Sequence, residues 1–416
     1  MASPQHQGSI HKSPIWLCLA LGYAFCAGSG FCLAAASVQT INEIHTFTHP
    51  APAADTHFTS IVALSSKYAA VLGWRGTHFT PTHHDVFIFD AITGQYLRTL
   101  SEPVPPDNIN FRFRSVAIDG NLAVIGAIYA HVPLPGGGIA YNAGAAYVYD
   151  LTTGQRKYKF VSDTPQGNFG LGESVGIYGD RIVVGSGGGG AYVLDATTGA
   201  QLARLSPSNP ADFFGGPVAI SESAIIVSGD SDPTPVNRIG AAHVYNPQTF
   251  ALMSKFVPDN AAATANFATS LAIDGRYAIG SGGFGAYIFD VITGTQLREL
   301  ALPATTDFGN AVDIQGTTAL LGNTDLGRAM TFNWMTGTPL QDLVPSDFAS
   351  GIPVGSDFGF TLALAGNNAI VAALGKAYEF RVVPEPSATI LLMFGAVAGG
   401  LWRGWSAWKY HQPINA

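Results

Sequence analysis

Four residues that could bind a metal ion lie close together in the chain: His78, His83, His84 and Asp85. Imidazole and carboxylate groups of this kind are common ligands of transition metals. Neighbouring side chains of an extended segment point to opposite sides, however, so His83 and His84 cannot both face one ion. The spacing matches no known metal site, and the sequence therefore predicts an exposed hairpin tip here.

Other catalytic chemistries have little support in the sequence. No Ser/His/Asp set, paired carboxylates or phosphate-binding loop rises above chance. The glycine run 187–190 lacks the following helix that phosphate binding needs, so it is predicted to be a hairpin turn. The three cysteines are Cys18, Cys26 and Cys32, which leaves the remainder of the chain without disulfides or thiol catalysis.

The N-terminus has the features of an export signal. His11 and Lys12 precede the apolar segment Ile15 to Ala27, and small residues at 34–36 follow. This order predicts a signal peptide over residues 1–36, cut by signal peptidase after Ala36. All three cysteines fall in this leader.

The C-terminus contains a second apolar segment. Val383-Pro384-Glu385-Pro386-Ser387 is followed by the apolar run Ala388 to Trp402 and then by Arg403 and Lys409. As a helix at about 1.5 Å per residue this run would reach about 22 Å, which is short for a membrane span of ~20 residues. Tryptophans and a cation at its end favour a membrane helix. The alternative is a C-terminal helix packed on a soluble core.

The order of these three parts resembles the PEP-CTERM sorting signal of Gram-negative bacteria. The resemblance covers about residues 383 to 409, and it implies that an exosortase-type membrane protease processes the tail. The residues that match the motif are Val383, Pro384, Glu385, Pro386 and Arg403. The family's tail usually closes on a tight basic cluster, whereas here Trp405 and Trp408 separate Arg403 from Lys409.

Composition restricts the fold class and the partners. The net charge is −8, and only 12% of the residues are charged. Nucleic acids and anionic lipids need a cationic face, so neither is an expected partner. The chain has 49 glycines and few segments of helical period, which indicates an all-β protein rich in turns.

A repeat organises the chain between the two signals. Segments of the general form Phe-Gly-x-x-Val-x-Ile recur, and their valine positions are Val62, Val116, Val175, Val218, Leu271, Val312 and Leu362. The six intervals from Val62 to Leu362 cover 300 residues, so the mean period is 50 residues. Each copy continues with an apolar run, an alternating strand such as Val86 to Asp90, a Thr-Gly turn and a polar strand. This pattern predicts a seven-bladed β-propeller over residues 37–382.

The seventh copy lacks its outer strand. Thr40 to Phe47 matches the pattern of the missing strand, so we expect it to pair with Ala377 to Arg381 and close the ring. The alternative is a disordered N-terminal linker.

The blades resemble FG-GAP repeats, the blade type of integrin α-subunits and many bacterial surface proteins. The match is strongest at Gly144 to Tyr149 and Gly240 to Tyr245 and runs through most of residues 57 to 382. FG-GAP blades often bind calcium through alternating carboxylates. The resemblance therefore implies a candidate calcium site in the fourth blade, at Asp230, Asp232 and Asn237. Pro233 interrupts the family pattern, and an ordinary solvated turn is the alternative.

The turns also resemble those of quinoprotein propellers, but Leu97, Leu202 and Leu297 replace the tryptophan that docks neighbouring blades in that family. The sequence singles out neither a carboxylate base nor calcium at the ring centre. We therefore expect a non-enzymatic binding or structural module. It would pass through the inner membrane to the cell surface or matrix, with extracellular polysaccharide or surface proteins as partners. The alternative is an exported enzyme of quinoprotein or lyase type that uses the central channel.

Overall fold

The structure is a computed structural model that describes residues 38–52, 56–77, 80–108, 110–187, 189–206, 214–230, 240–259, 267–282, 285–300, 311–324, 326–348 and 357–383. Apart from the short 3-10 helix η4 (Ser346–Phe348), every regular element in these ranges is a β-strand. No helix within these ranges is long and apolar enough to span a membrane. The predicted signal peptide and the predicted membrane segment Ala388 to Trp402 lie outside the described residues.

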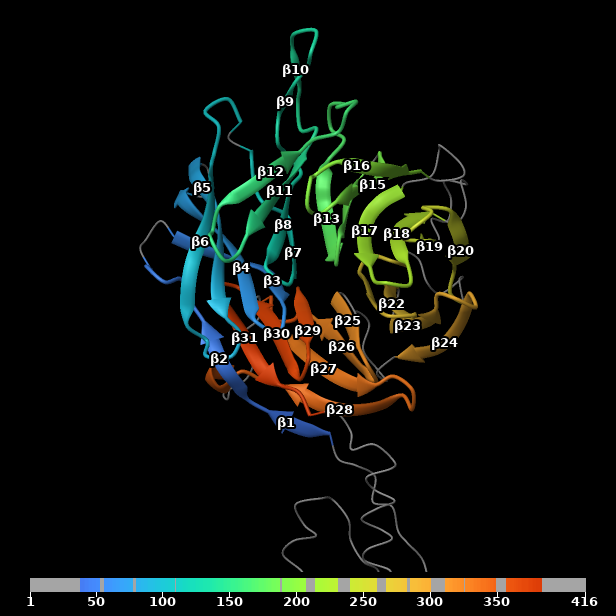
Figure 1. The fold of residues 1–416 in the computed structure, drawn as a ribbon. Helices are drawn as coiled ribbons and strands as arrows, with labels where there is room; N and C mark the ends of the chain where they lie inside the picture. The colour runs from blue at the N-terminus through green and yellow to red at the C-terminus, as the bar shows by residue number, and fades with distance from the viewer. Residues whose placement is uncertain are drawn as a thin grey trace, which may run out of the picture.

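The described strands form seven sheets of four or five strands arranged in a ring (Figure 1), which confirms the predicted all-β, seven-bladed β-propeller. Blades one and two contain β3 (Thr56–Leu64), β4 (Tyr68–Thr77), β5 (Thr80–Asp90) and β6 (Tyr96–Pro103), then β7 (Ser115–Asp119), β8 (Leu122–Ala127), β11 (Ala145–Asp150) and β12 (Arg156–Phe160). Blades three and four contain β13 (Leu171–Tyr178), β14 (Arg181–Ser186), β15 (Gly190–Asp195) and β16 (Gln201–Leu205), then β17 (Phe214–Ile220), β18 (Ile225–Asp230), β19 (Gly240–Tyr245) and β20 (Leu252–Phe256).

The remaining blades follow the same plan. Blades five and six contain β21 (Leu271–Asp274), β22 (Tyr277–Gly282), β23 (Gly285–Asp290) and β24 (Thr295–Leu300), then β25 (Ala311–Gln315), β26 (Thr318–Asn323), β27 (Arg328–Asn333) and β28 (Thr338–Leu343). Blade seven contains β29 (Leu362–Ala365), β30 (Asn368–Ala373) and β31 (Lys376–Arg381). A separate hairpin, β9 (Val132–Pro133) and β10 (Ile139–Ala140), projects from blade two.

The N-terminal segment closes the ring as predicted, with one correction. β2 (Glu43–Phe47) is the outer strand of blade seven and pairs antiparallel with β31, where Phe47 faces Ala377. Thr40 and Ile41 do not belong to this strand, contrary to the prediction. They lie in β1 (Gln39–Ile41), which adds in parallel to β28 of blade six. The open edge of β28 offers unpaired backbone groups, and β1 satisfies them.

The turns between third and outer strands explain the recurring Asp-x-x-Thr-Gly pattern. In blade one, Asp90 Oδ1 accepts hydrogen bonds from the amides of Ile92 (2.9 Å) and Thr93 (2.8 Å). These bonds hold the pKa of Asp90 below its ordinary value. Gly94 has a φ of 70°, a left-handed conformation that favours glycine. The pattern is therefore a structural turn.

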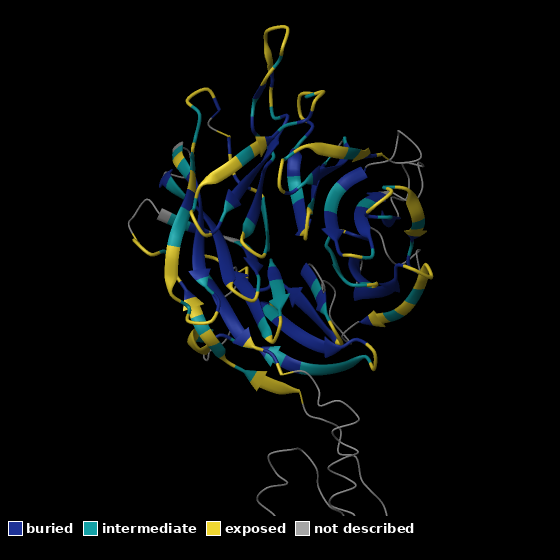
Figure 2. Ribbon diagram, viewed as in Figure 1, coloured by how far each residue is buried: buried dark blue, intermediate teal, exposed yellow. Residues whose placement is uncertain are grey.

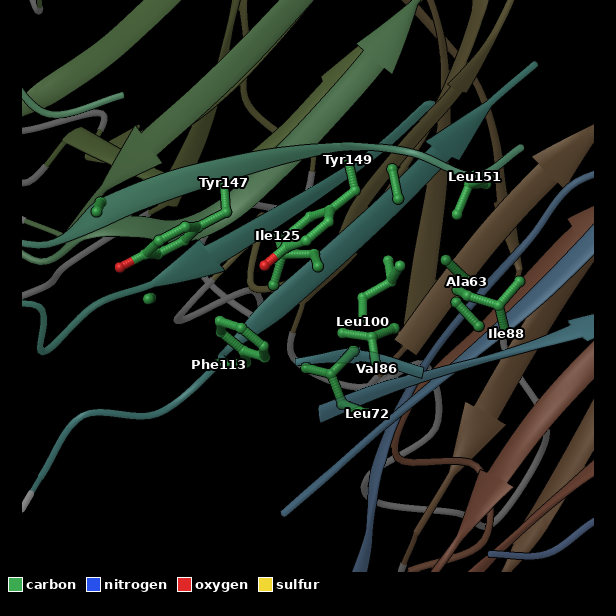
Figure 3. Packing of buried hydrophobic residues seen from close by; sticks show 14 of the residues in the cluster. Ala63, Leu72, Val86, Ile88, Leu100, Phe113, Ile125, Tyr147, Tyr149 and Leu151 are labelled. Atoms are coloured by element: carbon green, nitrogen blue, oxygen red, sulfur yellow. The ribbon is translucent and has the colours of Figure 1, made fainter. Parts of the chain in front are cut away.

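The core lies between neighbouring blades. Figure 3 shows one cluster, in which Leu72 and Ile88 of blade one pack against Ile125, Tyr147 and Tyr149 of blade two. The second and third strands are almost fully buried because both of their faces contact an adjacent blade. Exposed residues are concentrated on the outer strands and the projecting loops (Figure 2).

Candidate functional site

His78 lies outside the described residues, and His83, His84 and Asp85 are not at the exposed hairpin tip that we predicted. β4 and β5 extend to Thr77 and Thr80, so His83, His84 and Asp85 lie within a long strand pair. His84 is 7% exposed and makes edge-on ring contacts with Phe111 and Phe113 of the next blade. Burial, together with the charge of Arg112, lowers the pKa of His84 to about 4.

Asp85 beside it is fully buried and is held by a bidentate ion pair. Arg75 donates from Nε to Oδ2 (2.7 Å) and from Nη2 to Oδ1 (3.2 Å), and Ser101 donates to Oδ1. The ion pair between Arg75 and Asp85 therefore stabilises the hairpin of blade one. Within the described ranges no group of three His, Cys, Asp or Glu side chains could hold a metal ion.

The other residues singled out in the sequence fall largely outside the described ranges. Asp230 is the last residue of β18, and its backbone pairs with Gly240. Asp232 and Asn237 lie in the range 231–239, and Pro384, Glu385, Pro386 and Arg403 lie beyond Val383, so none of these is described. Val383 itself is 58% exposed.

The ring encloses a central cavity of about 930 Å³. Its wall is formed by the first strand of each blade, namely β3, β7, β13, β17, β21, β25 and β29. A cavity of this volume is large enough for a small-molecule ligand. Most of the lining side chains are aliphatic, and the described charged ones are Arg114, Glu173 and Asp313.

Hydroxyl groups in the wall join neighbouring blades. Each of three accepts a hydrogen bond from the backbone amide of the anchor residue in the following blade: Ser174 from Val218 (3.0 Å), Ser270 from Val312 (3.2 Å) and Thr361 from Val62 (3.2 Å). The last of these bonds links blade seven to blade one. The hydroxyls stand one position before the repeat's valine anchor, so their main role is to hold the ring together.

Asp313 has a similar structural role. Its Oδ2 accepts the amide of Leu364 in blade seven (2.6 Å), and its Oδ1 accepts the amide of Ile314 (2.8 Å). Desolvation raises the pKa of Asp313 to about 7, although both amide bonds act in the opposite direction. The two amide bonds fix the Asp313 carboxyl group in the wall and tie blade six to blade seven.

Contacts on the outside of the ring also join the blades. In every blade the register between the third and outer strands shifts by one residue at the same place. The skipped residues include Leu97, Leu202 and Leu297, which are 40%, 41% and 41% exposed. These leucines are partly exposed, so they are not buried between blades as a docking tryptophan would be.

The residue after the shift makes the contact instead. Arg98 Nη1 donates to the carbonyl of Thr152 in the next blade (2.9 Å), and Arg298 Nη2 donates to that of Met335 (2.7 Å). Tyr158 donates its hydroxyl to Ala196 O (2.8 Å). Sequence reasoning missed this set, although large polar side chains four residues after the turn glycine were a usable signal.

The two ends of the described chain meet at one residue, Gln341 of β28. Gln39 in β1 is its partner in the strand register, and the amide of Val383 donates to its Oε1 (3.2 Å). The Gln341 side chain is almost fully buried. Figure 1 shows β1 beside β28 at the lower edge of the ring. The chain therefore enters and leaves the propeller at adjacent points.

Comparisons with known proteins support the fold alone. No protein-family model matches the chain, and no curated protein matches its sequence. A chain in the crystal structure of the mitotic checkpoint complex is similar with a TM-score of 0.57 and 10% identity, covering 92% of this chain and 97% of that one. The computationally designed Ika8 protein is similar with a TM-score of 0.50 and 16% identity, covering 82% of this chain and 100% of its own. Together with the ring of sheets, these neighbours define the class of this protein as a seven-bladed β-propeller.

Proposed function

We propose that this protein is an exported, surface-associated propeller with a binding or structural role in the extracellular polysaccharide or biofilm matrix. The observation that supports the proposal is where the ring begins and ends in the chain relative to the two predicted targeting segments. The first strand starts at Gln39, just after the predicted cleavage site at Ala36, and the last strand ends at Arg381, just before Pro384. Both segments could therefore be removed without cutting a described blade.

The meeting of both chain ends at Gln341 fits this role. A leader and a tail that depart from adjacent points would tether the propeller to the membrane on one side only. The remainder of the ring would then face away from the membrane. A propeller held in this way can fold completely before it is released.

We further propose that an exosortase-type protease releases the protein at the tail. Two prolines around Glu385 favour an extended backbone that a protease cleft can bind. Ala388 to Trp402 and Arg403 would hold the chain in the inner membrane until that cut. The proposal rests on the resemblance of residues 383 to 409 to the PEP-CTERM signal.

Replacement of Pro384, Glu385 and Pro386 by alanine tests this function. We expect the variant to remain in the inner-membrane fraction while wild type reaches the cell surface or medium. Asp259→Ala, which removes an exposed carboxylate from the ring, is the control and should sort like wild type. Surface delivery of the triple variant with unchanged mass would refute the sorting role.

The alternative, an exported enzyme that uses the channel, is not better supported. The hydroxyls of Ser174, Ser270 and Thr361 and the carboxylate of Asp313 are engaged in blade-to-blade bonds. A binding module, unlike an enzyme, does not need a hydroxyl or carboxylate that is available for catalysis.

Calcium at Asp230, Asp232 and Asn237 is a separate proposal, carried by the FG-GAP resemblance. An ion bound only by the folded state raises stability by RT ln(1 + [L]/Kd). Calorimetry with calcium and with chelator tests it, and identical transitions would make the loop an ordinary turn.

A further inference from the structure

Blade two has the longest connection between second and third strands, and blade four, with residues 231–239, has the next longest. The blade-two connection has 17 residues, 128–144, and includes the β9–β10 hairpin. The corresponding connections in blades three, five, six and seven are 187–189, 283–284, 324–327 and 374–375. In repeat proteins, insertions in individual repeats map to loops on one face, which is often the binding face. Figure 1 shows the hairpin projecting well beyond the ring.

The insertion is a packed structure. Val132, Ala140 and Ala143 form a small core, with Leu134 and Val161 against it. Backbone bonds at Leu134 and Gly138 (3.1 Å) and at Gly144 and Ala130 (2.9 Å) close its turns. A surface that is already ordered loses little entropy when it binds a ligand.

The two neighbouring connections brace the insertion. On one side Asn108 Nδ2 donates to the carbonyl of Tyr129, and the Arg112 guanidinium lies 5.0 Å from the centre of the Tyr129 ring. On the other side the amide of Asn168 donates to the carbonyl of Tyr141 (2.8 Å). We call the described residues of the three connections, 104–108, 110–114, 128–144 and 161–170, the blade-two ledge.

The ledge presents an aromatic side chain to solvent. Tyr141 is 59% exposed, which makes it the most exposed tyrosine among the described residues. His131 supports it edge-on, with ring centres 4.9 Å apart and planes at 80°. Ile139, 38% exposed, lies on the same hairpin. Tyrosine offers a large, rigid, amphipathic contact surface at low entropic cost.

Besides the His131 ring, two amide side chains belong to the part of the ledge that carries Tyr141, and the charged residues of the ledge balance. Asn142 Nδ2 donates to Oδ1 of the exposed Asn168 (3.1 Å), and the backbone amide of Asn168 donates to the carbonyl of Tyr141, so both amide side chains belong to the segments that meet at Tyr141. The charged residues of the ledge are Asp107, Asp163, Arg112 and Arg114, so the two signs balance. A strongly charged ligand would find no complementary field here.

We propose that the blade-two ledge binds an uncharged polysaccharide, with one sugar ring stacked on Tyr141 and its hydroxyls bonded to the neighbouring amides. An aromatic face matches the C–H face of a sugar, and amide groups both donate to and accept from hydroxyls. The proposal rests on the proposed function and names its ligand class and its site. Because sorting is carried by the tail, glycan binding and surface delivery can fail independently.

The test measures binding of uncharged hexasaccharides to the full chain, purified in mild detergent, by titration calorimetry. The probes are cellohexaose, laminarihexaose and maltohexaose. We expect at least one to bind wild type, Tyr141→Ala to weaken it about tenfold or more, and Tyr141→Phe to stay within about threefold of wild type. Tyr178→Ala is the matched control, because Tyr178 is 44% exposed and lies at the far end of β13.

Three outcomes would overturn the proposal. The first is that wild type binds none of the three probes, as expected if the ledge contacts a protein instead. The second is that Tyr141→Ala and Tyr178→Ala bind as wild type does. The circular dichroism spectrum of each variant should match that of wild type, because neither Tyr141 nor Tyr178 belongs to the buried core. Tighter binding of an alginate hexamer than of any uncharged probe would also contradict the assignment.

Discussion

Closure of the ring by β2 predicts that Phe47→Ala destabilises the whole protein. Phe47 is 1% exposed and packs against Phe89 of blade one, with ring centres 4.7 Å apart. It belongs to a core cluster that contains residues of both blade seven and blade one, including Phe58 and Ile370. Truncation at this point would open a cavity at the seam where the two ends of the ring join.

The expected loss of stability in Phe47→Ala follows from the burial of the Phe47 side chain. A buried Phe→Ala change costs about 3–5 kcal/mol. Unfolding entropy is about 2.1 cal/mol/K per residue, which gives roughly 0.7 kcal/mol/K over roughly 345 residues. The melting temperature should therefore fall by about 4–7 °C. Ile44→Ala in the same strand is the control: Ile44 is 39% exposed, and its change should cost under about 1 kcal/mol.

Scanning calorimetry of the full chain measures both variants. A melting temperature for Phe47→Ala that is indistinguishable from that of Ile44→Ala would show that β2 is not an integral strand. Deletion of residues 37–48 is a more severe test of the same point. It leaves the edge of β31 unpaired, so the truncated chain should aggregate or melt still earlier.

Two further predictions concern the bonds around the channel. Because the folded pKa of Asp313, about 7, exceeds its ordinary value of 3.8, the protonated form is favoured in the fold, and stability is lost as the pH rises from about 4 to about 7. Relative to Asp313→Asn, which does not titrate, wild type should lose about 2–3 kcal/mol of stability between pH 5 and pH 8, and a difference independent of pH would contradict this. Ser174→Ala leaves the amide of Val218 without its acceptor and should cost about 1–3 kcal/mol in urea unfolding, whereas Ser223→Ala on the exterior turn should cost less than about 0.5 kcal/mol.

Much of the fold could be predicted because the sequence repeats. Each blade uses the same order of apolar run, alternating strand and turn, so a period of 50 residues was enough to count the blades. The outer strand of blade seven was identifiable because Glu43 to Phe47 has the pattern of the other outer strands. The position of Thr40 and Ile41 could not be predicted, because a short strand can add to either of two neighbouring open edges. The sequence of the strand does not distinguish between these two edges.

The features that depend on contacts between blades were harder to predict. His84 and Asp85 were expected at an exposed tip, because the sequence around them gives no sign that Phe111 and Phe113 of the next blade cover His84. Arg98 and Arg298 dock on turns in the following blade, more than fifty and nearly forty residues away in the chain, respectively. In the sequence, the blade-two ledge is only an interruption of the repeat. The contact between the His131 and Tyr141 rings depends on the folded hairpin.

The most direct test of the proposed function is the intact mass of the protein recovered from the cell surface. A single mass determination reports on both ends of the chain. Our account predicts a chain that begins at Ser37 and ends near Pro384 to Pro386, without the residues from Trp402 to Ala416. A surface protein that retains its C-terminal residues to Ala416, or a chain that keeps Met1 and stays inside the cell, would contradict it.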